Sequence, residues 1–149
     1  MSPVIATVIL VAVAITVSVA VAYWMGGIAG QYTKFEKVEI QSAICTTANG
    51  NWTITMKLKN TGTATTTLLS AFINDVEVDN YDSTGVVLGA WATSINVTTA
   101  STLTSGETKI VTFWLDSGKS GSTLSSGTTI NVKIHSAGGM DYIKLVELV

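Results

Sequence analysis

The sequence has 149 residues and a net charge of −2, and only 12% of its residues are charged. A weakly acidic chain gives no reason to expect a nucleic-acid partner, and a single cysteine excludes an intrachain disulfide and a cysteine-rich metal site. Because every charged residue lies from Lys34 onward, we predict an apolar first part, residues 1–33, and a second part of ordinary domain size, residues 34–149.

Residues 3–29 form an almost unbroken aliphatic run. A bilayer needs about 20 apolar residues for one helical span, and this run is longer. Ser2 is suited to the N-cap, where its hydroxyl could accept a hydrogen bond from the first turn, and Pro3 is suited to the first helical position. Tyr23 and Trp24 near the end of the run are typical of an aromatic anchor at a membrane interface. The pattern predicts a membrane-spanning helix.

Three glycines, Gly26, Gly27 and Gly30, follow the aromatic pair and predict a bend or the end of the helix. A secretory signal peptide is disfavoured, because the run is too long and no basic segment precedes it. Two interpretations remain: a single-span anchor, or a helix that first spans a membrane and later packs against copies of itself. The side chains expected to form the packed core of such an assembly are Pro3, Val4, Ile5, Val8, Ile9, Leu10, Val11, Val13, Ile15, Val17, Val19, Val21, Tyr23 and Trp24.

The first residues, Met1 to Val13, read MSPVIATVILVAV, and this segment resembles the N-terminus of a mature archaeal type IV pilin. The resemblance covers about the first 30 residues, and the remainder corresponds only as a class, a Thr-rich β-sandwich head. In that family a prepilin peptidase removes a short basic leader, so we expect the encoded precursor to carry one. Bacterial members usually have a glutamate where this chain has Ile5, which fits the archaeal branch.

The resemblance implies a homopolymer of identical subunits that forms an extracellular filament on the cell surface, used for adhesion. It also implies insertion in the cytoplasmic membrane before assembly, and an assembly ATPase and a membrane platform protein as partners. No enzymatic activity and no cofactor are expected. Two alternatives stay open: an archaellin of a swimming filament, although the Ser-Pro-Val-Ile-Ala-Thr start is closer to adhesive pilins, and a membrane-anchored β-sandwich binding module that never polymerises.

The second part of the chain alternates between apolar and polar residues, with turn signals at short intervals. Asn49-Gly50 predicts a tight hairpin, followed by an inward row of Trp52, Ile54, Met56 and Leu58. These features predict an antiparallel, immunoglobulin-like β-sandwich, and thus an α+β fold class for the whole chain. Further turns are expected at 60–62, 74–75, 105–106 and 137–139, and a loop at 117–127.

The remaining predicted strands follow the same alternation. The first carries Val38, Ile40 and Ile44, and the last, residues 140–149, is apolar on both faces, so we expect it to be central or covered by the helix or a neighbouring subunit. The other strands are expected at 68–73, 76–78, 110–115 and 130–134, with weaker ones at 86–88 and 95–97.

No nucleophile elbow, phosphate-binding loop or metal-spaced cluster is present in the sequence. His135 is expected at the surface, and Cys45 is expected to act as a small buried apolar residue. One acidic run comprises Asp75, Glu77, Asp79 and Asp82. We interpret this run as a solvated strand face, and a cation site with oxygen ligands is the alternative.

Two sequons, Asn51-Trp52-Thr53 and Asn96-Val97-Thr98, can accept N-linked sugar if the domain lies outside the cell. We expect both asparagines to be solvent-accessible and modified. The many Thr and Ser residues either fill the β-sheet surface, which suits Thr, or carry O-linked sugar.

Overall fold

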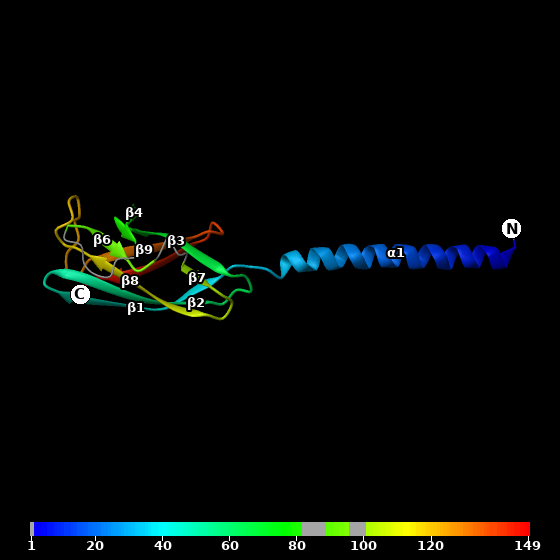
Figure 1. The fold of residues 1–149 in the computed structure, drawn as a ribbon, viewed down its shortest axis with the longest axis horizontal. Helices are drawn as coiled ribbons and strands as arrows, with labels where there is room; N and C mark the ends of the chain where they lie inside the picture. Colours follow the sequence, from blue (N-terminus) through cyan, green and yellow to red (C-terminus); the bar gives the residue numbers. More distant parts are fainter. Residues whose placement is uncertain (1, 82–88, 96–100) are drawn as a thin grey trace. The chain divides into compact units, whose positions relative to one another are not determined.

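The computed structural model describes residues 2–81, 89–95 and 101–149, and the chain forms two compact units, Met1–Phe35 and Glu36–Val149. The first unit contains one long helix, α1 (Pro3–Tyr32), drawn from blue to cyan in Figure 1. The second unit consists of β-strands in two sheets. A long apolar helix followed by a two-sheet β-domain confirms the predicted α+β fold class.

Helix α1 begins where the sequence predicts. Ser2 occupies the N-cap with extended backbone angles, φ −64° and ψ 136°, and Pro3 takes the first helical position, where its missing N–H is no loss. The Ser2 side chain makes no capping hydrogen bond, so that part of the prediction is wrong. Its carbonyl instead accepts hydrogen bonds from the N–H groups of Ile5 (3.1 Å) and Ala6 (3.2 Å), which begin the helical ladder.

The helix ends later than predicted. It continues straight through Gly26, Gly27 and Gly30 to Tyr32, so the expectation of a bend or an end at these glycines is wrong. The Thr33 hydroxyl donates to the Gly30 carbonyl at 3.2 Å in the last turn. Each glycine inside a helix destabilises it by about 0.5–1 kcal/mol relative to alanine, and the long hydrogen-bonded helix around them tolerates this.

The β-domain has ten strands among its described residues, coloured from cyan to red in Figure 1. They are β1 (Val38–Ala48), β2 (Asn51–Asn60), β3 (Thr66–Ile73), β4 (Val76–Glu77), β5 (Asn80–Tyr81), β6 (Trp91–Thr93), β7 (Ser101–Leu103), β8 (Thr108–Leu115), β9 (Thr129–Ser136) and β10 (Asp141–Glu147). One sheet has the order β1-β2-β8-β6-β5, and the other has the order β10-β9-β3-β4, with β7 also paired to β3. All described pairings are antiparallel except β5 with β6.

The β1–β2 hairpin forms as predicted. Asn49 and Gly50 both have positive φ, 53° and 80°, and Ala48 pairs with Asn51 across this two-residue turn. The inward row that follows in β2 is almost completely buried, with Trp52 at 5% exposure and the next three members at 0%. The alternation between apolar and polar residues therefore identified the buried face of this strand correctly.

Strand β1 contains a β-bulge that the sequence pattern did not predict. The register with β2 shifts between Ile40 and Ser42, which adds one residue to β1 and reverses the faces of the residues after it. Ala43 and Cys45 consequently pack against the core, whereas Ile44 is 60% exposed. Cys45 is partly buried and is a free thiol that contributes to apolar packing, as predicted.

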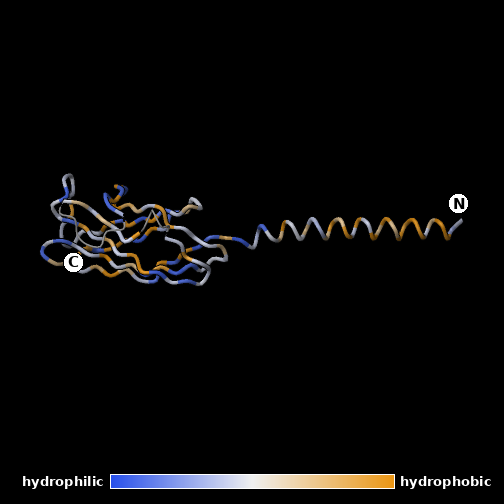
Figure 2. Tube along the Cα trace, in the orientation of Figure 1, coloured by the Kyte–Doolittle hydropathy of each residue, from blue (hydrophilic) through white to orange (hydrophobic). Residues whose placement is uncertain are grey.

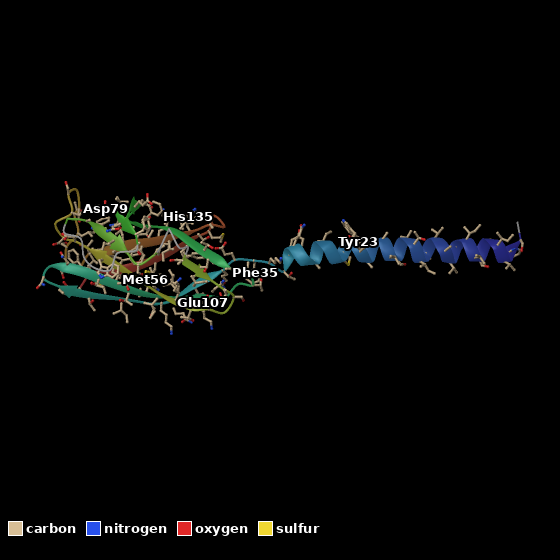
Figure 3. All side chains as sticks on the ribbon, viewed as in Figure 1. Tyr23, Phe35, Met56, Asp79, Glu107 and His135 are labelled. Carbon is tan, nitrogen blue, oxygen red and sulfur yellow. The ribbon has the colours of Figure 1, made fainter. Side chains whose placement is uncertain are left out.

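The core lies between the two sheets. Alternate residues of β9 supply three of its fully buried side chains, Ile130, Val132 and Ile134, as predicted. Figure 2 shows orange and blue segments alternating along the strands, and Figure 3 labels Met56, which lies in this core with 0% exposure. Other large, fully buried members are Ile54, Leu58, Leu68, Ile73, Ile95, Leu103, Phe113, Leu115 and Leu148.

Strand β10 is at the edge of its sheet, so the expectation that it is central is wrong. It pairs with β9 on one side only, and Tyr142 and Val146 of its inward row are buried, whereas Lys144 between them is exposed. Its outward row is not buried within this chain, because Ile143 is 54% and Leu145 is 65% exposed. Apolar character on both faces therefore does not mean a central position in this sheet.

The loop at 117–127 contains no helix or strand, as predicted, and one lysine fastens it to the first sheet. Lys119 Nζ lies 2.6 Å from Asp79 Oδ2 and 4.3 Å from the centroid of the Trp91 ring. The Trp91 backbone N–H donates to the same carboxylate at 2.8 Å.

Two weaker strands were predicted, at 86–88 and 95–97. Residue 95 lies outside any strand, and 86–88 and 96–97 lie outside the described residues.

Candidate assembly helix and sugar-attachment sites

Helix α1 presents apolar side chains on every side and contains no charged residue. None of its residues is buried, and the aliphatic ones predicted for the assembly core are between 47% exposed (Val21) and 71% exposed (Leu10). Leaving a large apolar side chain in water instead of burying it costs about 1.5–3 kcal/mol. The helix therefore requires an apolar environment, either lipid or other protein.

The serine and threonine hydroxyls of α1 are satisfied inside the helix. Thr7, Thr16 and Ser18 each donate to a backbone carbonyl three or four residues earlier, at 2.6–2.8 Å. Such bonds remove the need for water or a second polar partner at these positions. The stretch before Tyr23 can therefore enter lipid or a dry helix bundle without leaving a side-chain hydroxyl unpaired.

The length of α1 matches a membrane crossing up to its aromatic pair. From Pro3 to Trp24 the helix rises about 32 Å, close to the hydrocarbon thickness of about 30 Å. Tyr23 and Trp24 are 87% and 65% exposed, so their rings are available for the membrane interface. By length and composition this helix can span a membrane.

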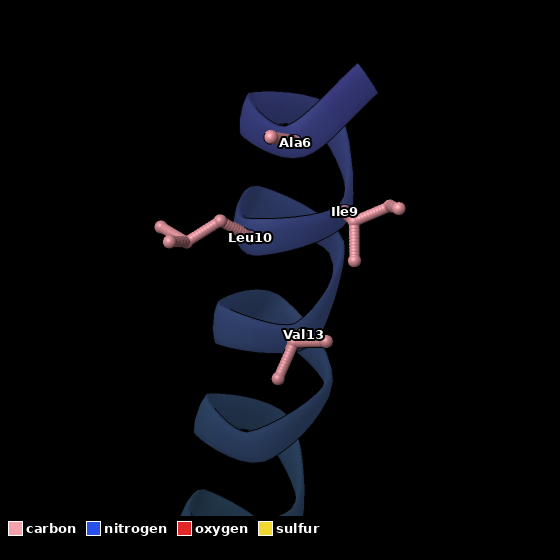
Figure 4. A pocket seen from close by; sticks show the side chains of 4 residues that line it. All are labelled: Ala6, Ile9, Leu10 and Val13. Carbon is pink, nitrogen blue, oxygen red and sulfur yellow. The ribbon is translucent and has the colours of Figure 1, made fainter. Parts of the chain in front are cut away.

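A shallow depression lies on the N-terminal part of α1 (Figure 4). Ala6, Ile9, Leu10 and Val13 line it, and Figure 4 shows the short Ala6 side chain above the longer ones of Ile9 and Leu10. Four residues at this helical spacing form the type of hole that receives a side chain from a second helix in knobs-into-holes packing. The depression is open and almost entirely apolar, so it can accept only an apolar group.

Small residues occur at intervals of four near the other end of α1. Because the helix continues past the glycines, Ala22, Gly26 and Gly30 lie along one side. A Cβ atom built on Gly26 or Gly30 would meet nothing within 4 Å, so no contact within this chain requires glycine there. Small residues at this spacing allow two helix backbones to approach closely.

Asn51, the first predicted sugar-attachment site, is the first residue of β2 and is half-exposed. Its Oδ1 accepts hydrogen bonds from the backbone N–H of Ser117 (3.1 Å) and the Ser117 hydroxyl (3.3 Å). Thr53 lies on the same outward face of the strand, whereas the intervening Trp52 points into the core. Both recognition side chains of the sequon are therefore on the solvent side of the sheet. Asn96, the second predicted site, lies outside the described residues.

The described members of the acidic run, Asp75, Glu77 and Asp79, have separate partners. Asp75 pairs with Lys133 Nζ at 2.7 Å, and Glu77 accepts a hydrogen bond from the Tyr81 hydroxyl at 2.7 Å. Burial and the bond to Glu77 raise the pKa of Tyr81 to about 12, and the bond to Asp75 raises the pKa of Lys133. Asp79 binds Lys119, and Asp82 lies outside the described residues. In the part of the chain that the structure describes, no three His, Cys, Asp or Glu residues could together hold a metal ion.

His135 lies on the outward face of β9 and is partly exposed, as predicted for a surface residue. Its Nδ1 is 2.5 Å from Asp141 Oδ1, and both side chains are between 40% and 46% exposed. The pair links β9 to β10 at the position where these two residues face each other in the register. It has the geometry of a cross-strand contact at the sheet surface.

Three features of the candidate sites were missed by the sequence analysis. The Ala6 depression and the Gly26–Gly30 spacing could have been found from their helical intervals, because both lie within the predicted helix. The bond between Asn51 and Ser117 joins residues 66 positions apart, and no local pattern indicates it. Neither the models of known protein families nor the sequences of curated proteins give a match to this chain.

Proposed function

We propose that this chain is a non-enzymatic structural subunit of an extracellular archaeal pilus, used for adhesion, in which α1 of each subunit packs against α1 of identical subunits. The observation that carries the proposal is the surface of α1, which is apolar on every side, lacks charge and has internally bonded Ser and Thr hydroxyls. The resemblance of Met1 to Val13 to mature archaeal type IV pilins supports the same assignment.

Before assembly, α1 lies in the cytoplasmic membrane. Lipid tails are as apolar as the helix, so helices gain little hydrophobic free energy by associating there. Moving the subunit from lipid into a filament thus requires work from outside, which is the role of an assembly ATPase and a membrane platform protein. The prepilin peptidase acts earlier, on the encoded precursor.

Once outside the membrane, α1 has only the helices of other subunits to cover it. Summed over its aliphatic side chains, exposure to water would cost on the order of tens of kcal/mol, so subunits do not leave the filament spontaneously. The Ala6 depression can receive a side chain from a neighbouring helix. Gly26 and Gly30 allow a second backbone to approach closely, which explains glycine at positions where this chain alone does not need it.

The membrane-anchored binding module is the second candidate, and the match between the Pro3–Trp24 length and the bilayer thickness favours it equally. It does not require an open depression or unhindered glycines on α1. An archaellin would have the same architecture as a pilin, so only the behaviour of cells separates these two.

Electron microscopy of the cell surface, with an antibody against the β-domain, tests the proposal. Labelled filaments that disappear when the gene is deleted, with swimming retained and surface attachment reduced, are the expected result. Label confined to the membrane, without filaments, would contradict it in favour of the anchored module. Loss of swimming with the filaments would identify an archaellin.

A further inference from the structure

An aromatic ring lies beside the predicted sugar-attachment site. In the pairing of β2 with β8, Thr53 of the sequon is directly opposite Trp114, which places Asn51 diagonally from Trp114 on the same outward face. Trp114 is half-buried, whereas Trp52 and Trp91 are only 5% and 4% exposed. Trp114 is therefore the one tryptophan of the β-domain that offers part of its ring to the solvent side of this sheet.

The Asn51 side chain is held in place. Its Oδ1 accepts two hydrogen bonds from Ser117, the second residue after β8, so the planar amide is fixed near the end of the strand that carries Trp114. The sugar attaches to Nδ2 of the same amide. The attachment point of a glycan is therefore held in one position. Less conformational entropy is lost when the first sugars of the glycan contact the sheet.

The surroundings of Trp114 leave room for a sugar ring. On the outward face Trp114 lies between Thr53 of β2 and the buried Ala92 of β6, with Thr55 paired to Thr112 one step along. The diagonal distance between such positions is about 7–8 Å between Cα atoms, which an asparagine side chain and one pyranose ring can span together. The register ends at the Trp52–Leu115 pair, and Asp116, the next residue after Leu115 on the side of Asn51, is buried at 4% exposure.

We propose that Trp114 is a stacking platform for the N-linked oligosaccharide on Asn51, so that its first pyranose lies against the indole ring. One face of a pyranose carries several C–H bonds with slight positive charge, and the indole face carries the negative part of its quadrupole. The bound glycan covers the Thr-rich outward face of the β2–β8 pair. This inference rests on the proposed extracellular location of the chain and on the predicted N-linked sugar at Asn51.

Site-resolved oxidation of tryptophan in the native, full-length chain, read by peptide mass spectrometry, tests the stacking. The same spectra give the mass of the peptide that carries Asn51. In Asn51→Gln we expect Trp114 oxidation to rise about threefold, which corresponds to the lower end of the free energy of an aromatic contact. Thr53→Ser keeps the sequon and should leave Trp114 protected, and the buried Trp52 and Trp91 serve as internal references for unfolding.

The outcomes are distinguishable. A sugar on Asn51 with equal Trp114 oxidation in the wild type and in Asn51→Gln would overturn the stacking and leave the glycosylation intact. A wild-type peptide of unmodified mass would overturn both. If Trp52 and Trp91 are also oxidised in Asn51→Gln, the variant has unfolded. Thr53→Val then decides, because it removes the sugar and keeps both Asn51 and the side-chain shape opposite Trp114: a rise confined to Trp114 supports the stacking, and no rise refutes it.

Discussion

Lys119 is the residue that fastens the longest described loop of the β-domain to the sheet beneath it. Its side chain is only 14% exposed, and it lies against both the Asp79 carboxylate and the Trp91 ring. Burial alone would raise the pKa of Asp79, but the hydrogen bonds from Lys119 and the Trp91 backbone, together with the lysine charge, hold it below its usual value. The ionised carboxylate is therefore the form that the fold stabilises.

Asp79→Asn should destabilise the β-domain by about 1–2 kcal/mol, because it leaves a largely buried lysine charge without its partner. The matched control is Asp75→Asn, which breaks the Lys133 pair, where the carboxylate is 76% exposed. That change should lower the free energy of unfolding by less than about 0.5 kcal/mol. Urea unfolding of the full chain in detergent measures both, and equal effects would show that Lys119 is not a special attachment point.

The contribution of Asp79 should depend on pH with a definite sign. Because its pKa in the folded chain lies below the ordinary value of 3.8, the stabilisation is present above that value and is lost as the pH falls through the folded pKa. The difference in unfolding free energy between the wild type and Asp79→Asn should therefore be constant near neutral pH and shrink in acid. A difference that grows in acid would contradict the assignment.

Whether a residue faces the core or the solvent was predicted well where this depends only on residues nearby in the sequence. The inward row of β2 and the outward position of His135 in β9 follow from alternation alone. The partners of Asp79 and Asn51, Lys119 and Ser117, come from a loop 40 and 66 residues away, and only the sheet topology brings them together.

At the scale of elements, local sequence signals predicted where the strands lie in the chain better than they predicted the order of the strands in the sheets. Asn49-Gly50 specified the β1–β2 hairpin, because both positions need a positive φ. The edge position of β10 depends on which strands pair, and an apolar outward row can equally be covered by another molecule. The bulge in β1 leaves no clear trace in the sequence, and it alone moves Ile44 to the outside.

Gly26→Leu should abolish or weaken filaments while the subunit itself remains intact. A Cβ at this position meets nothing in the chain, and leucine favours helix more than glycine by about 0.8–1 kcal/mol. Any defect therefore arises between molecules. Filament yield and membrane content are measured on the same cells, with Met25→Leu as the neighbouring control. Normal filaments in Gly26→Leu would mean that no helix approaches closely there.

For the whole molecule, the proposed function assigns assembly to the unit Met1–Phe35 and leaves the folded core to the other unit. The unit Glu36–Val149 contains every strand that the structure describes and the entire core. A fragment of residues 36–149 should accordingly fold as a soluble β-protein that forms no filaments, as judged by circular dichroism and sedimentation. The exposed Ile143 and Leu145 make weak self-association the expected side effect, and Leu145→Thr should reduce it. An unfolded fragment would show that the β-domain depends on the helix.

The central claim is that α1 forms the packed core of a filament, and a charge in its middle tests this most directly. Val13, which lines the Ala6 depression, is replaced by Asp, with Val13→Leu as the apolar control. An unpaired carboxylate among apolar helices costs several kcal/mol in every subunit, and membrane insertion weakens by about 2.5–3.5 kcal/mol. The measurement is the number of surface filaments seen by electron microscopy. We expect none, or short fragile ones, in Val13→Asp and normal numbers in Val13→Leu, whereas normal, denaturant-resistant filaments in Val13→Asp would contradict the account.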